Sequence, residues 1–129
     1  MQTDGKLRIL VAEDDRDTAH ALARLLRHMG FESRVCYTGL QCLACIEEFQ
    51  PQIVLLDLGM PEIDGFEVAE RIRELASASR PVLVALTGYG RQVDRERTAR
   101  AGFAFHLLKP ALAGDIKTAI EQACRLLPG

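Results

Sequence analysis

A five-residue segment, Ile53–Asp57, places the strongest constraint on how this chain folds. Four apolar residues follow one another without a polar interruption, and the run ends in the carboxylate of Asp57. A strand without polar alternation suits burial on both faces, as in a parallel sheet that helices cover. Asp57 is then expected at the carboxyl end of a central strand, where open α/β sheets bind their ligands. Taken alone, an aspartate at a strand end is more often a turn former.

The remaining sequence alternates between strand-like and helix-like patterns. Apolar runs predict strands over 7–12, 32–37, 53–57, 81–86 and 103–108. Apolar residues at helical spacing predict helices over 15–29, 40–46, 66–75 and 116–127, and a very polar helix is expected over 91–101. Strict alternation of strands and helices implies right-handed crossovers, and therefore an α/β fold with a doubly wound, five-stranded parallel sheet.

Length and composition indicate one ordinary globular domain. The chain has 129 residues, of which 48% are hydrophobic, and no apolar run nears the roughly 18 residues needed to span a membrane. We expect a short tail over residues 1–6 and one domain over residues 7–127. The polar N-terminus lacks the apolar core of a signal peptide, which favours a cytoplasmic location. A net charge of −2 argues against nucleic acid or membrane partners.

The four cysteines are expected to pack as small apolar residues rather than to form a site. Cys42 and Cys45 have the C-x-x-C spacing of redox motifs and half-zinc sites. A second such pair, or two histidines in register, is missing from the sequence. The segment also fits the middle of an amphipathic helix, so free thiols in a reducing compartment are the preferred interpretation.

Five polar residues follow or end the predicted strands. They are Glu13, Asp14, Asp57, Thr87 and Lys109. Because the carboxyl ends of parallel strands meet at one edge of the sheet, these side chains are expected to converge on one crevice. Each has an ordinary alternative role: the acidic residues can cap a helix, Thr87 can be a turn hydroxyl, and Lys109 can be a solvated charge. Their joint placement on successive strand ends favours a common function.

The chemistry of this set suits phosphoryl transfer. Three carboxylates in one crevice repel one another, and an all-oxygen cluster of this kind suits Mg²⁺. A metal, a hydroxyl and an ammonium group around one carboxylate can stabilise the charge on a transferring phosphoryl group. We therefore expect Glu13, Asp14 and Asp57 to bind Mg²⁺, and Asp57 to act as the nucleophile that forms an acyl phosphate.

With these residues, the chain resembles the receiver domains of bacterial two-component response regulators. The matching motifs are Glu13-Asp14, Asp57 with Met60-Pro61, Asp64-Gly65, Thr87-Gly88 and Lys109-Pro110. The resemblance covers residues 7–127. It implies the flavodoxin-like receiver fold with strand order 2-1-3-4-5, and phosphorylation by the phosphohistidine of a histidine kinase or a histidine phosphotransfer domain. It also implies a phosphoacceptor rather than an independent enzyme.

The resemblance assigns roles to the site residues. Magnesium is expected on Asp14, Asp57 and the backbone carbonyl of Gly59, with Glu13 acting through water. Thr87 is expected to hydrogen-bond the phosphoryl group and Lys109 to pair with it. A cis peptide between Lys109 and Pro110 is expected to direct the lysine into the crevice.

This chain departs from the family pattern at His106, where many members carry the Tyr or Phe of an aromatic switch. The surrounding sequence resembles receivers of hybrid sensor histidine kinases, so the chain is either a single-domain regulator or the receiver of a longer protein. If His106 turns inward on phosphorylation, burial is expected to lower its pKa and couple the switch to pH. The alternative is a surface histidine without a switching role.

The polar helix over 91–101, with the last-strand face, is the expected surface for a downstream protein partner. Apart from Val93, Ala99 and Ala101 it offers few apolar positions, so weak anchoring and mobility are expected. The alternative is that this helix is an ordinary solvated, charged surface.

Three other functions fit the sequence less well. A haloacid-dehalogenase-type phosphatase also uses an aspartate nucleophile, but it needs a second carboxylate two residues later, where Gly59 stands. A dinucleotide-binding motif starting at Gly88 would need its third glycine at Val93. A receiver-like module that binds proteins without phosphorylation is disfavoured because all five site positions are intact.

Overall fold

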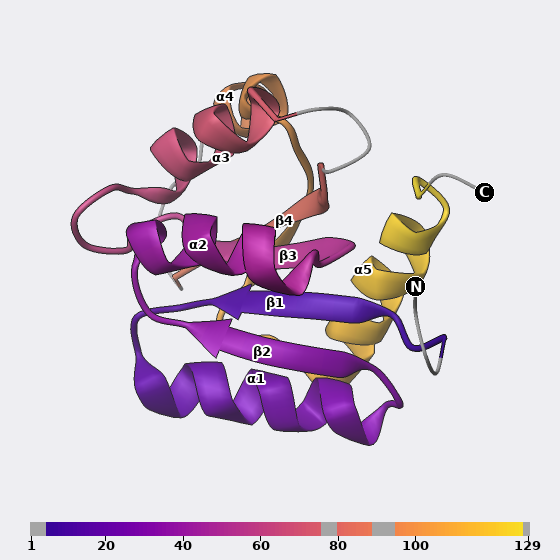
Figure 1. Cartoon of the computed structure of the whole chain (residues 1–129). Helices are drawn as coiled ribbons and strands as arrows, with labels where there is room; N and C mark the ends of the chain where they lie inside the picture. Colours follow the sequence, from indigo (N-terminus) through magenta and orange to yellow (C-terminus); the bar gives the residue numbers. More distant parts are fainter. Residues whose placement is uncertain (1–4, 76–79, 89–94, 128–129) are drawn as a thin grey trace.

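The computed structural model describes residues 5–75, 80–88 and 95–127, and there the chain forms one five-stranded sheet between helices (Figure 1). The strands lie in the order β2-β1-β3-β4-β5, and all neighbouring pairs are parallel. The strands are β1 (Arg8–Ala12), β2 (Glu32–Cys36), β3 (Ile53–Asp57), β4 (Val82–Thr87) and β5 (Phe103–Leu108). The helices are α1 (Arg16–His28), α2 (Gly39–Phe49), α3 (Gly65–Arg73), α4 (Arg95–Ala101) and α5 (Ala113–Cys124). The predicted doubly wound fold and strand order are confirmed.

Helices cover both faces of the sheet. Helices α1 and α5 pack on one face, and α2 and α3 pack on the other. Successive strand residues point to opposite faces, so Leu55 contributes to the first apolar layer and Leu56 to the second. All five residues of β3 are buried, which explains why its sequence shows no polar alternation.

The observed boundaries differ from the predicted ones by a few residues at several ends. Strand β4 runs to Thr87, which therefore ends the strand instead of following it. The part of the expected polar helix over 91–94 lies outside the described residues, and the described helix α4 begins at Arg95. Among the described residues, no helix is both long and apolar enough to cross a membrane.

Side-chain caps explain where two of the helices begin. The Thr38 hydroxyl accepts a hydrogen bond from the Gln41 N–H at the start of α2, and the Asp64 carboxylate accepts one from the Glu67 N–H at the start of α3. Asp15 occupies the corresponding position of α1 without making such a bond. The acidic cluster after β1 is therefore not explained by helix capping alone.

The cysteines lie mainly in the apolar layer between β2 and α2. Cys36 and Cys42 are buried, Cys45 is half-buried, and Cys124 is exposed on α5. All four are free thiols. The packing expected for the C-x-x-C segment is confirmed by the burial of Cys42 in the core beside Cys36.

The central strand supplies a stability prediction. Leu55 is fully buried in the layer that α1 and α5 cover. Replacing it by alanine removes buried apolar atoms and leaves a cavity, so Leu55→Ala is expected to lower the free energy of unfolding by about 2–5 kcal/mol. Urea denaturation measures this loss. Leu112→Ala is the control, because Leu112 is 67% exposed and its truncation leaves no cavity. Equal losses in the two variants would contradict the assigned core.

Candidate functional site

Three carboxylates meet at the carboxyl edge of the sheet. Glu13 and Asp14 follow β1, and Asp57 ends the neighbouring strand β3. One oxygen of each carboxylate lies within 4.8 Å of an oxygen of the others. Glu13 and Asp57 are buried, and Asp14 is exposed. The predicted convergence of these residues is therefore present in the structure.

Lys109, the residue after β5, joins this acidic cluster. Its Nζ atom lies 2.7 Å from Glu13 Oε1 and 3.3 Å from Asp57 Oδ2. The Lys109 N–H donates a hydrogen bond of 2.7 Å to the carbonyl of Thr87, which fixes the backbone of the lysine against the end of β4. The predicted cis peptide between Lys109 and Pro110 is confirmed.

Backbone hydrogen bonds hold Asp57 and the turn after it. The Gly59 N–H donates to Asp57 Oδ1 at 3.0 Å. The Leu58 N–H donates to the Leu86 carbonyl at 3.2 Å, and the Gly65 N–H donates to the Leu58 carbonyl at 3.1 Å. One carboxylate oxygen of Asp57 is thus bound to its own turn, while the other faces the Lys109 ammonium.

Burial and neighbouring charges oppose each other in this cluster. Burial raises the pKa of Glu13 and outweighs its hydrogen bond from Lys109. Burial also acts to raise the pKa of Asp57, but the Gly59 N–H, Asp14 and Lys109 outweigh it and lower that pKa. The pKa of Lys109 is raised, because its bonds to Glu13 and Asp57 outweigh burial. Asp57 is therefore an ionised carboxylate beside an ammonium group.

The oxygen donors of this edge fit a hard divalent cation. Magnesium prefers oxygen ligands, few protein ligands and several waters. The cluster offers an exposed carboxylate in Asp14 beside the buried carboxylates of Glu13 and Asp57, so one side of the group remains open to water. Cysteines and histidines, the ligands of softer metals, are absent from this group of described residues.

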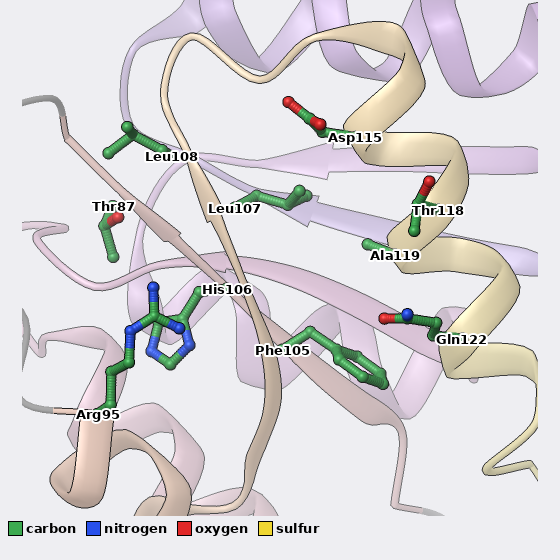
Figure 2. Close-up of a pocket in the computed structure, with 10 residues that line it drawn as sticks. All are labelled: Thr87, Arg95, Phe105, His106, Leu107, Leu108, Asp115, Thr118, Ala119 and Gln122. Carbon is green, nitrogen blue, oxygen red and sulfur yellow. The ribbon is translucent and has the colours of Figure 1, made fainter.

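Thr87 lies beside the acidic cluster at the end of β4. Its neighbour Leu86 pairs with Asp57 in the register of the sheet, and Thr87 itself pairs with Leu108 of β5. Its side chain is 5% exposed. Thr87 also lines a cavity of about 520 Å³ that extends along β5 between α4 and α5 (Figure 2).

His106 contacts α4 through a hydrogen bond that the sequence did not predict. Its Nε2 atom lies 2.7 Å from the hydroxyl of Thr98, and that hydroxyl donates to the Arg95 carbonyl at 3.0 Å. A hydroxyl has one proton, so Thr98 either accepts from the His106 Nε2–H or instead donates to His106 Nε2, according to the imidazole tautomer. Thr98 is fully buried, whereas Ala99 is exposed. The sequence offered Ala99 as one of the few apolar positions of this helix, but the buried contact with His106 is made by the Thr98 hydroxyl.

The surroundings of His106 disfavour its charged form. Burial lowers the pKa of His106, and the nearby guanidinium of Arg95 lowers it further. Arg95 lies on α4 beside the imidazole in Figure 2, and Asp115 of α5 lines the same cavity. His106 is half-buried, so its imidazole is neither enclosed in the protein interior nor fully exposed to solvent.

Comparison with known sequences points to one family. Residues 9–121 match the response regulator receiver domain. The chain is 35% identical over 128 residues to an uncharacterized 14.6 kDa protein of Leptolyngbya boryana, with 99% of this chain and 98% of that protein covered. It is 30% identical over 120 residues to hybrid signal transduction histidine kinase B of Dictyostelium discoideum, with 84% of this chain but 6% of the kinase covered.

Comparison with solved structures supports the same fold. The receiver domain of Saccharomyces cerevisiae Ssk1, crystallised with the histidine phosphotransfer protein Ypd1, superposes with a TM-score of 0.82. The two sequences are 23% identical, and the superposition covers 95% of this chain and 92% of that one.

The lowered pKa of His106 predicts a pH dependence of stability. Because the folded pKa lies below the unfolded value of about 6.5, the unfolded chain takes up a proton first as the pH falls. The stability that the neutral His106 side chain contributes is fully present above the pKa of the unfolded chain. It is lost as the pH falls from the unfolded pKa toward the folded pKa. Urea unfolding at about pH 7.5 and about pH 5.5 measures the loss. We expect His106→Asn to lose less stability between these pH values than the wild type.

A matched variant separates this effect from general acid destabilisation. His28 is exposed in the last turn of α1, so His28→Asn should keep the wild-type pH dependence. The assignment of the effect to His106 is wrong if both asparagine variants show the same pH dependence as the wild type.

Proposed function

Because this chain belongs to the family of response regulator receiver domains, we propose that Asp57 accepts a phosphoryl group from a phosphohistidine in a Mg²⁺-dependent reaction. Receiver domains act in two-component signalling. The observation that carries the proposal is the buried, ionised carboxylate of Asp57, which lies beside Lys109 and shares its crevice with Glu13 and Asp14.

The chain's own residues supply the nucleophile and its orientation. A carboxylate oxygen of Asp57 attacks phosphorus, the P–N bond of the phosphohistidine breaks, and the imidazole leaves with the bonding electrons while an acyl phosphate forms. The Gly59 N–H holds the other carboxylate oxygen of Asp57 through the bond of 3.0 Å. The lowered pKa of Asp57 means that no base is needed to ionise it.

Charge on the transferring group requires compensation. Bound Mg²⁺ would neutralise phosphoryl oxygens, and Asp14, Asp57 and the Gly59 carbonyl are the proposed ligands, with Glu13 acting through water. The Lys109 ammonium, now on Glu13 and Asp57, is the proposed partner of the new phosphoryl group.

The proposed readout passes from Asp57 to β5 through Thr87 and His106. A phosphoryl group adds about −1.5 to −2 charge and three acceptor oxygens, which can draw the Thr87 hydroxyl toward Asp57. His106 then exchanges its Thr98 contact for the space beside Thr87, and burial lowers its pKa further. NMR titration of the imidazole with and without beryllofluoride tests this step, and an unchanged pKa and rotamer would refute it.

Partners follow from the same proposal. The donor is a histidine kinase or a histidine phosphotransfer domain, as the Ypd1 complex of the similar Ssk1 receiver supports. The proposed downstream partner is a protein that binds α4 and the β5 face, without direct contact to nucleic acid or membrane. We propose that the domain works in the cytoplasm as a phosphoacceptor and not as an independent enzyme.

Two alternative functions receive less support. A haloacid-dehalogenase-type phosphatase needs a second carboxylate where Gly59 stands, and here the Gly59 N–H instead binds Asp57. A protein-binding module without phosphorylation would not require Asp57, Lys109 and Thr87 to lie at one edge of the sheet, as they do.

Small-molecule phosphorylation tests the proposal. Acetyl phosphate with Mg²⁺ is expected to add one phosphoryl group to the wild type, as measured by intact mass spectrometry, and Asp57→Asn should abolish the addition. The control is Asp64→Asn, because Asp64 is an exposed N-cap and asparagine also caps helices. This control should be labelled like the wild type. Labelling of Asp57→Asn at the wild-type level, or undiminished labelling of the wild type after Mg²⁺ is chelated, would refute the mechanism.

A further inference from the structure

Gly39, the first residue of α2, lies against the turn that follows the phosphoacceptor strand. A Cβ atom at this position would overlap Cγ1 of Ile63, and it would lie 2.7 Å from the Ile63 carbonyl oxygen and 2.9 Å from Cγ2 of Val68. The backbone of Gly39 is not in the left-handed region, so its conformation is open to any residue. The close approach to Ile63, and not backbone freedom, is what requires glycine here.

The turn that Gly39 contacts, residues 58–64, is held at both ends. At its start the Gly59 N–H binds the Asp57 carboxylate. At its end the Gly65 N–H binds the Leu58 carbonyl, and a Cβ on Gly65 would lie 2.8 Å from the Asp57 carbonyl oxygen. Glu62, inside the turn, has a positive φ of 72°. A displacement at one point of such a short, fixed segment is therefore transmitted to the backbone beside Asp57.

Packing decides which side of the Gly39 contact moves when a methyl group is added. Helix α2 is seated on the sheet by Cys42, Ile46 and Phe49, which are at most 4% exposed. In the turn, Leu58 and Met60 are also buried, but Gly59, Pro61 and Glu62 are exposed to solvent. Moving the turn disturbs fewer buried side chains than lifting α2, so the turn is expected to yield first.

We propose that Gly39 is a positioning residue for the Mg²⁺ and phosphoryl site at Asp57. It is the first residue of α2, whereas the site residues lie at strand ends and in the loops that follow them. It acts by allowing Ile63 to seat the turn that carries Gly59. The inference rests on the proposed function, because the ion concerned is the Mg²⁺ of that proposal. It adds to that function a residue from the β2–α2 side of the fold.

Gly39→Ala tests the inference by two measurements. Calorimetric titration with Mg²⁺ is expected to show affinity about tenfold weaker than in the wild type, at the lower end of the range for residues that orient metal ligands. Without metal, the amide NMR signal of Gly59 is expected to shift, because its hydrogen bond to Asp57 changes. Gly114→Ala is the matched control. Gly114 is also in the first turn of a helix, but a Cβ there meets nothing within 4 Å.

A double variant tests the steric cause. Ile63→Ala removes the Cγ1 atom that the new methyl group would meet, so Gly39→Ala combined with Ile63→Ala should recover part of the lost Mg²⁺ affinity. If Gly39→Ala does not fold, the double variant is compared with Ile63→Ala alone. The remaining contact with the carbonyl oxygen of residue 63 should then still weaken Mg²⁺ binding relative to that single variant.

The outcomes distinguish this inference from the proposed function. Wild-type Mg²⁺ affinity and an unmoved Gly59 signal in Gly39→Ala, even with lower stability, would show a purely structural role and overturn the inference. A wild-type chain that binds no Mg²⁺ would overturn the proposed function instead. In that case the Gly59 signal still decides whether Gly39 positions the turn.

Discussion

The two contacts of the Lys109 ammonium are the interaction on which the functional edge of the sheet depends. They link β5 to the buried carboxylates of Glu13 after β1 and Asp57 at the end of β3. Removing one partner of a buried ion pair leaves an uncompensated charge in the protein interior. The resulting loss of folding stability is larger than the stability that the pair itself contributes. In the proposed function, the oxygens of a phosphoryl group on Asp57 compete with Glu13 for this ammonium. Under that proposal, one side chain holds the resting site together and responds to phosphorylation.

The sequence predicted what depends on strand order and strand ends. The unbroken apolar run of β3 indicated burial on both faces, and alternation with helices indicated a parallel sheet. In such a sheet the residues after strands share one edge, so Glu13, Asp57 and Lys109 were expected together, and the structure places them together. The positions of these residues in the sequence are sufficient for this prediction, because a parallel sheet places the carboxyl ends of its strands along one edge.

Contacts between helices and loops were not predictable in this way. The Thr98 hydroxyl bound to His106 lies on a helix whose composition suggested weak anchoring, and a threonine on a charged helix ordinarily faces solvent. The approach of Gly39 to Ile63 joins residues 24 positions apart through the shape of a turn. Hydrophobic periodicity identifies which helices and strands form. It does not determine how far each helix is rotated about its axis or how it is shifted along its neighbours, and these side-chain pairings depend on both.

A crystal structure with Mg²⁺ and beryllofluoride, a mimic of the phosphoryl group, would show how Lys109 and the carboxylates respond to phosphorylation. We expect beryllofluoride on the carboxylate of Asp57 and Mg²⁺ in contact with Asp14 and Asp57. We also expect the Lys109 ammonium to leave Glu13, now 2.7 Å away, and to bind the fluorine atoms of the mimic. A complex in which Lys109 remains on Glu13, or in which Mg²⁺ binds away from Asp14 and Asp57, would refute the proposed site.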